Sequence, residues 1–133
     1  MVGTKKAEKL KIIVVDDSEL SRSSISKILT DEGFTVTGTA ANAKDALMLL
    51  GSNECNLMII DVVMPTSSGI DLVKTLNEQG LNFRYILISS LDLENVIIES
   101  ISNGVSDYLK KPFSSKELVD SVNRVQKIMQ DDV

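Results

Sequence analysis

Four of the five apolar runs in this sequence end on a residue that could do chemistry. Asp16 and Asp17 follow the first run, Asp61 ends the third, Ser89 follows the fourth and Lys111 follows the fifth. Carboxylates without histidine or clustered cysteine favour a hard cation, and Mg²⁺ is commonly bound by a few carboxylates, waters and a phosphate. The hydroxyl and the ammonium are donors for an anion. Together these groups fit a phosphoryl group on Asp61, with a metal on one side.

The apolar runs alternate with amphipathic stretches, which predicts five strand–helix units in one domain. Strands are expected over 11–15, 34–39, 57–61, 83–88 and 107–110, and helices over 20–32, 43–50, 69–79, 93–103 and 114–129. Strict alternation favours a parallel sheet with right-handed crossovers and helices on both faces. The expected fold is a flavodoxin-like (βα)5 three-layer sandwich with strand order 2-1-3-4-5.

That strand order brings the candidate residues to one edge of the sheet, because neighbouring strands lie about 4.8 Å apart. The two acidic strand ends become adjacent, and Ser89 and Lys111 are expected on the far side of Asp61. Two charges about 4 Å apart repel by roughly 4 kcal/mol at an effective dielectric near 20, so three carboxylates this close need a cation or a proton.

Local signals set the helix ends and the core. Ser18, Asn42 and the capping box Ser114–Glu117 can begin helices, and glycines such as Gly33 can end them. Apolar helix positions are core residues by default, which places Leu20, Met48 and Ile101 inside. Ile97 and Ile98 cannot both point inward from one helix, so one of them is expected on a partner-facing surface.

Composition excludes several classes of function. A net charge of -5 argues against a direct nucleic-acid surface, and the absence of histidine with a single cysteine, Cys55, argues against zinc and disulfide chemistry. No apolar run approaches the roughly 20 residues that span a bilayer. We therefore expect no membrane contact, a cytoplasmic location, a flexible segment over 1–9 and one domain over 10–130.

With these residues in place, the sequence resembles the receiver domain of two-component response regulators, especially the single-domain chemotaxis type. The resemblance covers about 9–127 and rests on five motifs in order: Asp16-Asp17-Ser18 with Arg22; Ala40 and Asn42 with Ala46-Leu47; Asp61-x-x-Met64-Pro65-x-x-x-Gly69; Ser89; and Gly104-x-x-x-Tyr108-x-x-Lys111-Pro112-Phe113. Each motif is weak alone, and the five together are specific.

The resemblance implies that Asp61 accepts a phosphoryl group from a phosphohistidine of a sensor kinase, from a phosphotransfer protein or from a small acyl phosphate. It implies Mg²⁺ held by Asp17, Asp61 and the Val63 backbone carbonyl, with Asp16 holding a metal-bound water. Lys111 would pair with phosphoryl oxygens.

The same resemblance implies a switch: Ser89 would hydrogen-bond the phosphoryl group and Tyr108 would follow it inward. The surface of the fourth helix, fifth strand and fifth helix would then change toward an output protein or a phosphorylation-dependent dimer. The chain would catalyse only its own phosphorylation and dephosphorylation. The Lys111-Pro112 bond resembles the cis peptide of the family.

The sequence departs from the family pattern after the acceptor. Val63 is apolar where polar residues often influence dephosphorylation, and Thr66-Ser67-Ser68 lacks the methionine and acidic residue often found before Gly69. Ser89 replaces the commoner threonine, and Ser90 the usual alanine. The phosphoryl lifetime is therefore left open.

Two other classes of protein fit the sequence less well. A phosphatase like the haloacid dehalogenase group would need an Asp-x-Asp motif after the first strand and a cap domain, and neither is present in the sequence. A flavin-binding module would need a Ser/Thr/Gly-rich phosphate loop there. A DNA-binding regulator stays open only as the parent of a fragment, since 126–133 does not look like a linker into a helix-turn-helix.

Overall fold

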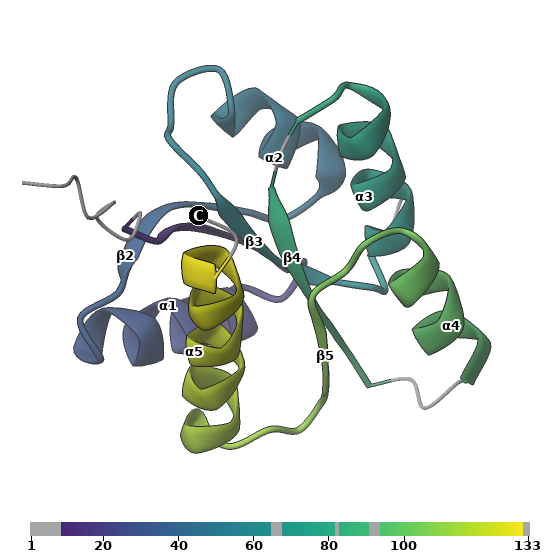
Figure 1. Cartoon of the computed structure of the whole chain (residues 1–133). Coiled ribbons are helices and arrows are strands. Elements are labelled where there is room, and N and C mark those ends of the chain that lie inside the picture. Colours follow the sequence, from purple (N-terminus) through teal and green to yellow (C-terminus); the bar gives the residue numbers. More distant parts are fainter. Residues whose placement is uncertain (1–8, 65–67, 82, 91–93, 132–133) are drawn as a thin grey trace, which may run out of the picture.

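A computed structural model describes residues 9–64, 68–81, 83–90 and 94–131 of the chain. Strands and helices alternate throughout (Figure 1). The strands are β1 (Lys11–Val15), β2 (Thr35–Ala40), β3 (Leu57–Asp61), β4 (Arg84–Ser89) and β5 (Asp107–Lys110). The helices are α1 (Glu19–Asp31), α2 (Ala43–Leu49), α3 (Gly69–Glu78), α4 (Glu94–Ser102) and α5 (Ser115–Asp131).

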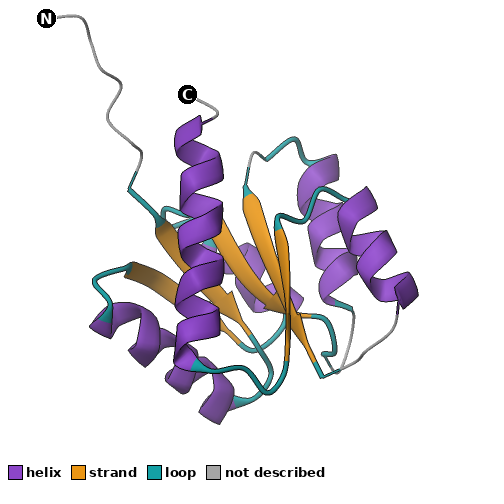
Figure 2. Ribbon diagram, turned by 60° about the horizontal axis from the view of Figure 1, so that its bottom comes forward, coloured by secondary structure: helices purple, strands orange, loops and turns teal. Residues whose placement is uncertain are grey.

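The sheet has the expected strand order, β2-β1-β3-β4-β5, and every pair is parallel. The flavodoxin-like prediction is therefore confirmed. Val15 pairs with Ile60, and Asp61 pairs with Ile88, so the carboxyl ends of β1, β3 and β4 are nearly level. The carboxyl ends of these strands lie at one edge of the sheet (Figure 2).

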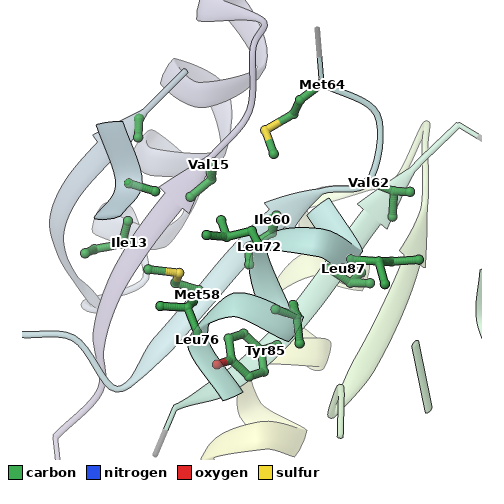
Figure 3. Close-up of a cluster of buried hydrophobic side chains, with 14 residues drawn as sticks. Ile13, Val15, Met58, Ile60, Val62, Met64, Leu72, Leu76, Tyr85 and Leu87 are labelled. Carbon is green, nitrogen blue, oxygen red and sulfur yellow. The ribbon is translucent and has the colours of Figure 1, made fainter. Parts of the chain in front are cut away.

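Alternating side chains of the inner strands supply two separate cores. Ile12 and Val14 face the side of α1 and α5, where they join Leu29 and Val122. The opposite-facing residues of β1 and β3 pack against α2 and α3, and Figure 3 shows this second cluster. Strands buried on both faces explain why their sequences read as unbroken apolar runs.

Helix starts follow the predicted caps. Ser18 accepts a hydrogen bond from the Ser21 amide, and Asn42 accepts one from the Asp45 amide. At the last helix the Ser114 hydroxyl accepts from the Glu117 amide while the Glu117 carboxylate accepts from the Ser114 amide, which completes a capping box.

The predicted burial of three apolar residues is wrong. Leu20, Met48 and Ile101 have 83%, 67% and 68% of their surface exposed. Each lies on a helix whose inner face is filled by other residues, such as Ile25 on α1, so an apolar side chain on the outer face stays in water. Ile98 is exposed and Ile97 half-buried, as expected for that pair.

Some expectations fall on residues outside the described ranges. These are most of the 1–9 segment, Pro65, Thr66 and Ser67 after the acceptor strand, the expected helix start at Leu93 and the side chain of Val96. The Lys111-Pro112 bond is cis. Over the ranges that are described, no helix combines the length and the apolarity needed to cross a membrane.

Candidate phosphoacceptor site

Three carboxylates meet at the carboxyl ends of β1 and β3. One oxygen each from Asp16, Asp17 and Asp61 lies within 4.8 Å of the others. Asp16 and Asp61 are buried, and Asp17 is exposed. An all-oxygen set with one open side suits Mg²⁺, which keeps several waters and takes one or two protein carboxylates. The donor set therefore fits the metal that the sequence predicts.

Lys111 enters this acidic cluster from the loop after β5. Its ammonium lies 2.8 Å from Asp16 Oδ2 and 3.0 Å from Asp61 Oδ2. Strand order predicted that Lys111 would lie on the far side of Asp61 from β1. Its side chain instead contacts both Asp61 and Asp16, at the end of β1. One ammonium therefore offsets the repulsion between two buried carboxylates, which is the positive charge that the cluster requires.

The carboxylate of Asp16 is held by three donors. The Ser18 amide lies 2.9 Å from Oδ1, and the Ser21 hydroxyl lies 2.6 Å from Oδ2, beside the Lys111 contact. Burial acts to raise the pKa of Asp16, but these hydrogen bonds outweigh it, and the pKa lies below its ordinary value. Asp16 is therefore ionised at neutral pH although it is fully buried.

Asp61 has a different environment. Burial raises the pKa of its carboxyl, and the hydrogen bonds from Lys111 and from the Val63 amide, 3.0 Å from Oδ1, offset only part of that effect. The side chain of Asp61 keeps 9% of its surface exposed, so it is open to a reactant. Two neighbouring carboxyls with opposite pKa shifts are typical of functional sites.

Gly69 lets the next helix begin directly against the acceptor strand. A Cβ atom at this position would lie 2.3 Å from the Asp61 carbonyl oxygen. The Gly69 amide also donates to the Val62 carbonyl at 2.8 Å, and Ser68 caps α3 by accepting from the Ile70 amide. This close approach fixes the backbone around Asp61.

Ser89 and Tyr108 lie where their strands place them. Ser89 ends β4 and is fully buried, and its carbonyl accepts from the Lys111 amide at 2.7 Å. Tyr108 lies on β5 opposite Leu87 and is half-buried. It borders a hollow of ≈ 250 Å³ shared with Ile97, Ile101 and Val105.

Ser21 was not among the predicted site residues, but its hydroxyl donates a hydrogen bond to the carboxylate of Asp16. A hydroxyl three residues after the capping Ser18 was the available signal, because positions three apart lie on one side of a helix. Arg22 is part of a predicted motif, but no contact was predicted for it. Its guanidinium donates to the Asp16 carbonyl at 2.7 Å, so it holds the backbone of the acidic loop.

A shallow apolar hollow adjoins the site. It has a volume of ≈ 530 Å³ and lies between α1 and the loop that leads into α5. Its apolar lining comes from Leu20, Ile25, Ile28, Pro112 and Phe113, and its polar lining from Ser18, Ser21, Ser24, Ser90 and Lys111. Lys111 therefore borders both the hollow and the carboxylate cluster.

The fold and the site together indicate the family to which the protein belongs. The family model described as "Response regulator receiver domain" matches residues 12–123. The chain therefore belongs to the response regulator receiver domain family.

Two curated relatives illustrate the range of the family. The chain is 29% identical over 117 residues to the chemotaxis protein CheY of Thermotoga maritima, an alignment that covers 88% of this chain and 98% of the relative. It is 34% identical over 114 residues to the response regulator SaeR of Staphylococcus aureus, covering 86% of this chain and 49% of the relative. The chain thus spans nearly all of one relative and about half the length of the other.

Two solved structures are similar to this chain over most of its length. The receiver domain of the Francisella response regulator 1452 has a TM-score of 0.81 and 36% identity, with 90% of this chain and 98% of that one covered. CheY in the CheX-CheY-BeF3-Mg²⁺ complex of Borrelia burgdorferi has a TM-score of 0.81 and 27% identity, with 87% of this chain and 88% of that one covered.

Proposed function

We propose that this chain accepts a phosphoryl group on Asp61 in two-component signal transduction. The observation that carries the proposal is the pairing of one ammonium, Lys111, with two buried carboxylates beside the exposed Asp17. Stability alone gives no reason to gather these charges, since a buried ion pair of this kind is often no more stabilising than apolar residues. A charged, partly open cluster of this composition suits phosphoryl transfer.

The acceptor step uses groups that are already placed. An oxygen of Asp61 attacks phosphorus, the bond from phosphorus to the donor breaks, and the donor group leaves with the bonding electrons. Lys111 is 3.0 Å from that carboxylate, so its ammonium is within reach of the oxygens of a phosphoryl group on Asp61. Ser89, at the end of the adjacent strand, is our candidate for a further hydrogen bond to those oxygens.

Asp17, Asp61 and the Val63 carbonyl are the proposed Mg²⁺ ligands, with Asp16 holding a metal-bound water. When bound, Mg²⁺ would neutralise the negative charge that gathers between the carboxylates and the phosphoryl oxygens. The solved Borrelia complex contains Mg²⁺ and BeF3 together with CheX and CheY, which supports a metal in the proposed chemistry.

The phosphodonor is proposed to be a sensor histidine kinase or a phosphotransfer protein, both consistent with a cytoplasmic location. The apolar hollow beside Lys111 supports this, because a donor protein must approach Asp61 closely and exposed Leu20 offers it an apolar contact. Small acyl phosphates are proposed as alternative donors. We propose no direct nucleic-acid role for residues 10–130, which we take as the receiver domain.

The output surface is proposed to be formed by α4, β5 and α5. Ile98 and Ile101 of α4 are both exposed, which supports a partner or a second copy on this face. The hollow beside Tyr108 gives its ring space to move when Ser89 changes partners. Signal would thus pass from Asp61 through Ser89 and Tyr108 to the α4 surface.

The test is phosphorylation of the whole chain by acetyl phosphate, followed by intact mass. With Mg²⁺ we expect one added phosphoryl group per chain, and none with a chelator or in Asp61→Ala. No mass increase, or an equal increase in Asp61→Ala, would overturn the proposal. Continued release of phosphate from a generic ester, far above one equivalent per chain, would point instead to a phosphatase.

A further inference from the structure

Ser21 makes the shortest of the three hydrogen bonds to the carboxylate of Asp16. Its hydroxyl lies 2.6 Å from Oδ2, against 2.8 Å for Lys111 and 2.9 Å for the Ser18 amide on Oδ1. Asp16 is fully buried, so its oxygens depend on protein donors rather than on bulk water. Ser21 is the neutral side chain among these donors, and the function proposed above assigns it no role.

The first turn of α1 explains how Ser21 reaches this carboxylate. Ser18 caps the helix, and the Ser21 amide donates to the Ser18 hydroxyl at 3.2 Å. The same turn carries Arg22, whose guanidinium holds the Asp16 carbonyl. One helical turn therefore fixes both the backbone and the side chain of Asp16, the most deeply buried member of the metal-fitting cluster.

We propose that Ser21 is a positioning residue for Mg²⁺, which acts by fixing the orientation of the Asp16 carboxylate. The proposal rests on the function proposed above. A carboxylate offers about four lone-pair sites, and Ser21 and Lys111 take the two on Oδ2. The capacity to accept a hydrogen bond from a metal-bound water therefore lies with Oδ1. Outer donors that orient a ligating carboxylate typically affect metal affinity about 10- to 100-fold, and because Asp16 acts through a metal-bound water we expect the lower end of that range.

Lys111 cannot hold this orientation alone. Its ammonium is shared between Asp16 and Asp61, and in the proposed reaction it pairs with the phosphoryl oxygens. Among the described residues, Asp16 is the one carboxylate that the Ser21 hydroxyl contacts, so Ser21 can keep Oδ2 in place while the lysine changes partners. The Asp16 carboxylate would then keep one orientation through the reaction.

The test is the dissociation constant of Mg²⁺ for the unphosphorylated whole chain, measured by calorimetric titration. We expect Ser21→Ala to raise this constant about 10-fold. Ser21→Thr keeps the hydroxyl and should restore the constant to within about twofold of the original. Ser24→Ala is the matched control, because Ser24 lines the same hollow one turn further along α1 and is exposed.

A second readout separates positioning from simple support of the fold. With acetyl phosphate as donor, Ser21→Ala should need about 10-fold more Mg²⁺ for half-maximal phosphorylation and reach nearly the original rate at saturation. If the alanine variant does not fold, Ser21→Cys, which has a similar shape and only a weak S–H donor, takes its place with the same expectation.

Two results would overturn the proposal. One is a Mg²⁺ constant for Ser21→Ala, or for its cysteine substitute, within twofold of the original. The other is an equal rise in Ser24→Ala. In either case, phosphorylation of Asp61 in the original chain would leave the proposed function intact. Absence of Mg²⁺ binding by the original chain would instead overturn the metal site itself.

Discussion

The ammonium of Lys111 lies 3.0 Å from the carboxylate of Asp61, although the two residues are 50 positions apart in the sequence. The same nitrogen is 2.8 Å from Asp16. Burial acts to lower the pKa of Lys111, but its contacts with Asp16 and Asp61 outweigh burial and raise it, so the side chain is charged at neutral pH. This charge allows two buried carboxylates to remain close together at the end of the sheet.

Replacing Lys111 by methionine should destabilise the fold in the absence of divalent metal. Breaking a buried ion pair leaves charge uncompensated and costs about 3 kcal/mol at the lower end of the usual range, which applies here because 25% of the Lys111 side chain is exposed. Urea unfolding with chelator measures the loss, and millimolar Mg²⁺ should recover part of it.

Lys116→Met is the matched control, because the Lys116–Asp120 pair lies in solvent on α5. It should leave the free energy of unfolding nearly unchanged, because an ion pair in solvent is screened by water and salt. Equal effects of the two substitutions would show that the buried pairing of Lys111 contributes no more to the free energy of unfolding than an exposed ion pair does.

Gly69→Ala should disturb the acceptor loop. The added methyl group would meet the Asp61 carbonyl oxygen at 2.3 Å, which forces the start of α3 away from β3. We expect a loss of about 1–3 kcal/mol in the free energy of unfolding, the usual cost of overpacking, together with slower phosphorylation by acetyl phosphate. Gly51→Ala, whose Cβ would be 3.4 Å from the Met48 carbonyl, should leave both properties unchanged. A Gly69→Ala protein with native stability would contradict this account of the loop.

Asp107 should contribute a pH-dependent part of the stability. Burial acts to raise its pKa, but hydrogen bonds from Ser121 and Arg124 of α5 outweigh it and lower the pKa below 3.8. A lowered native pKa stabilises the fold above the unfolded-state value, and that contribution is lost as pH falls through the native value. Asp107→Asn should therefore cost about 1–2 kcal/mol at pH 7.

The measurement compares urea unfolding of the original chain and Asp107→Asn at pH 7, 4.5 and 3. The gap in stability should persist from pH 7 to 4.5 and shrink toward pH 3, as the native carboxylate gains its proton. Asp120→Asn, on the solvent side of α5, is the matched control and should show little gap at pH 7. A gap that stays constant down to pH 3 would show that the charge of Asp107 is not what tethers α5.

Cys55 should react slowly in the native protein. Burial raises the pKa of its thiol from 9.0 to about 11, which leaves about 100-fold less thiolate at pH 8. Reaction with a disulfide reagent should be slower than for a free thiol by at least that factor and should reach the ordinary rate in denaturant. Rapid reaction of the folded chain would contradict the burial of this side chain.

The fold was predictable because each strand carries its own signal. Strands buried on both faces, such as β3, read as continuous apolar runs, and the capping residues Ser18 and Asn42 mark where helices begin. The outer faces of helices were less predictable. Leu20 and Ile101 are apolar yet exposed, since a single sequence does not separate a core side chain from an apolar one on the surface.

The site was predictable to the level of strand ends but not of side-chain reach. The topology alone brings Asp16, Asp17 and Asp61 to one edge. Lys111 lies in the loop after β5 rather than on the strand, so strand order alone could not say that its ammonium would reach Asp16. Ser21 lies within a helix rather than at a strand end, so an argument from strand ends did not predict its bond to Asp16.

Chemical trapping can identify the residue that accepts the phosphoryl group. Borohydride reduces the acyl phosphate of aspartate to homoserine, which peptide mass mapping can locate. After treatment of the whole chain with acetyl phosphate and Mg²⁺, we expect homoserine at position 61 alone, and none when a chelator replaces the metal. Homoserine at position 16 or 17, or a stable phosphoryl group on Ser89, would contradict it.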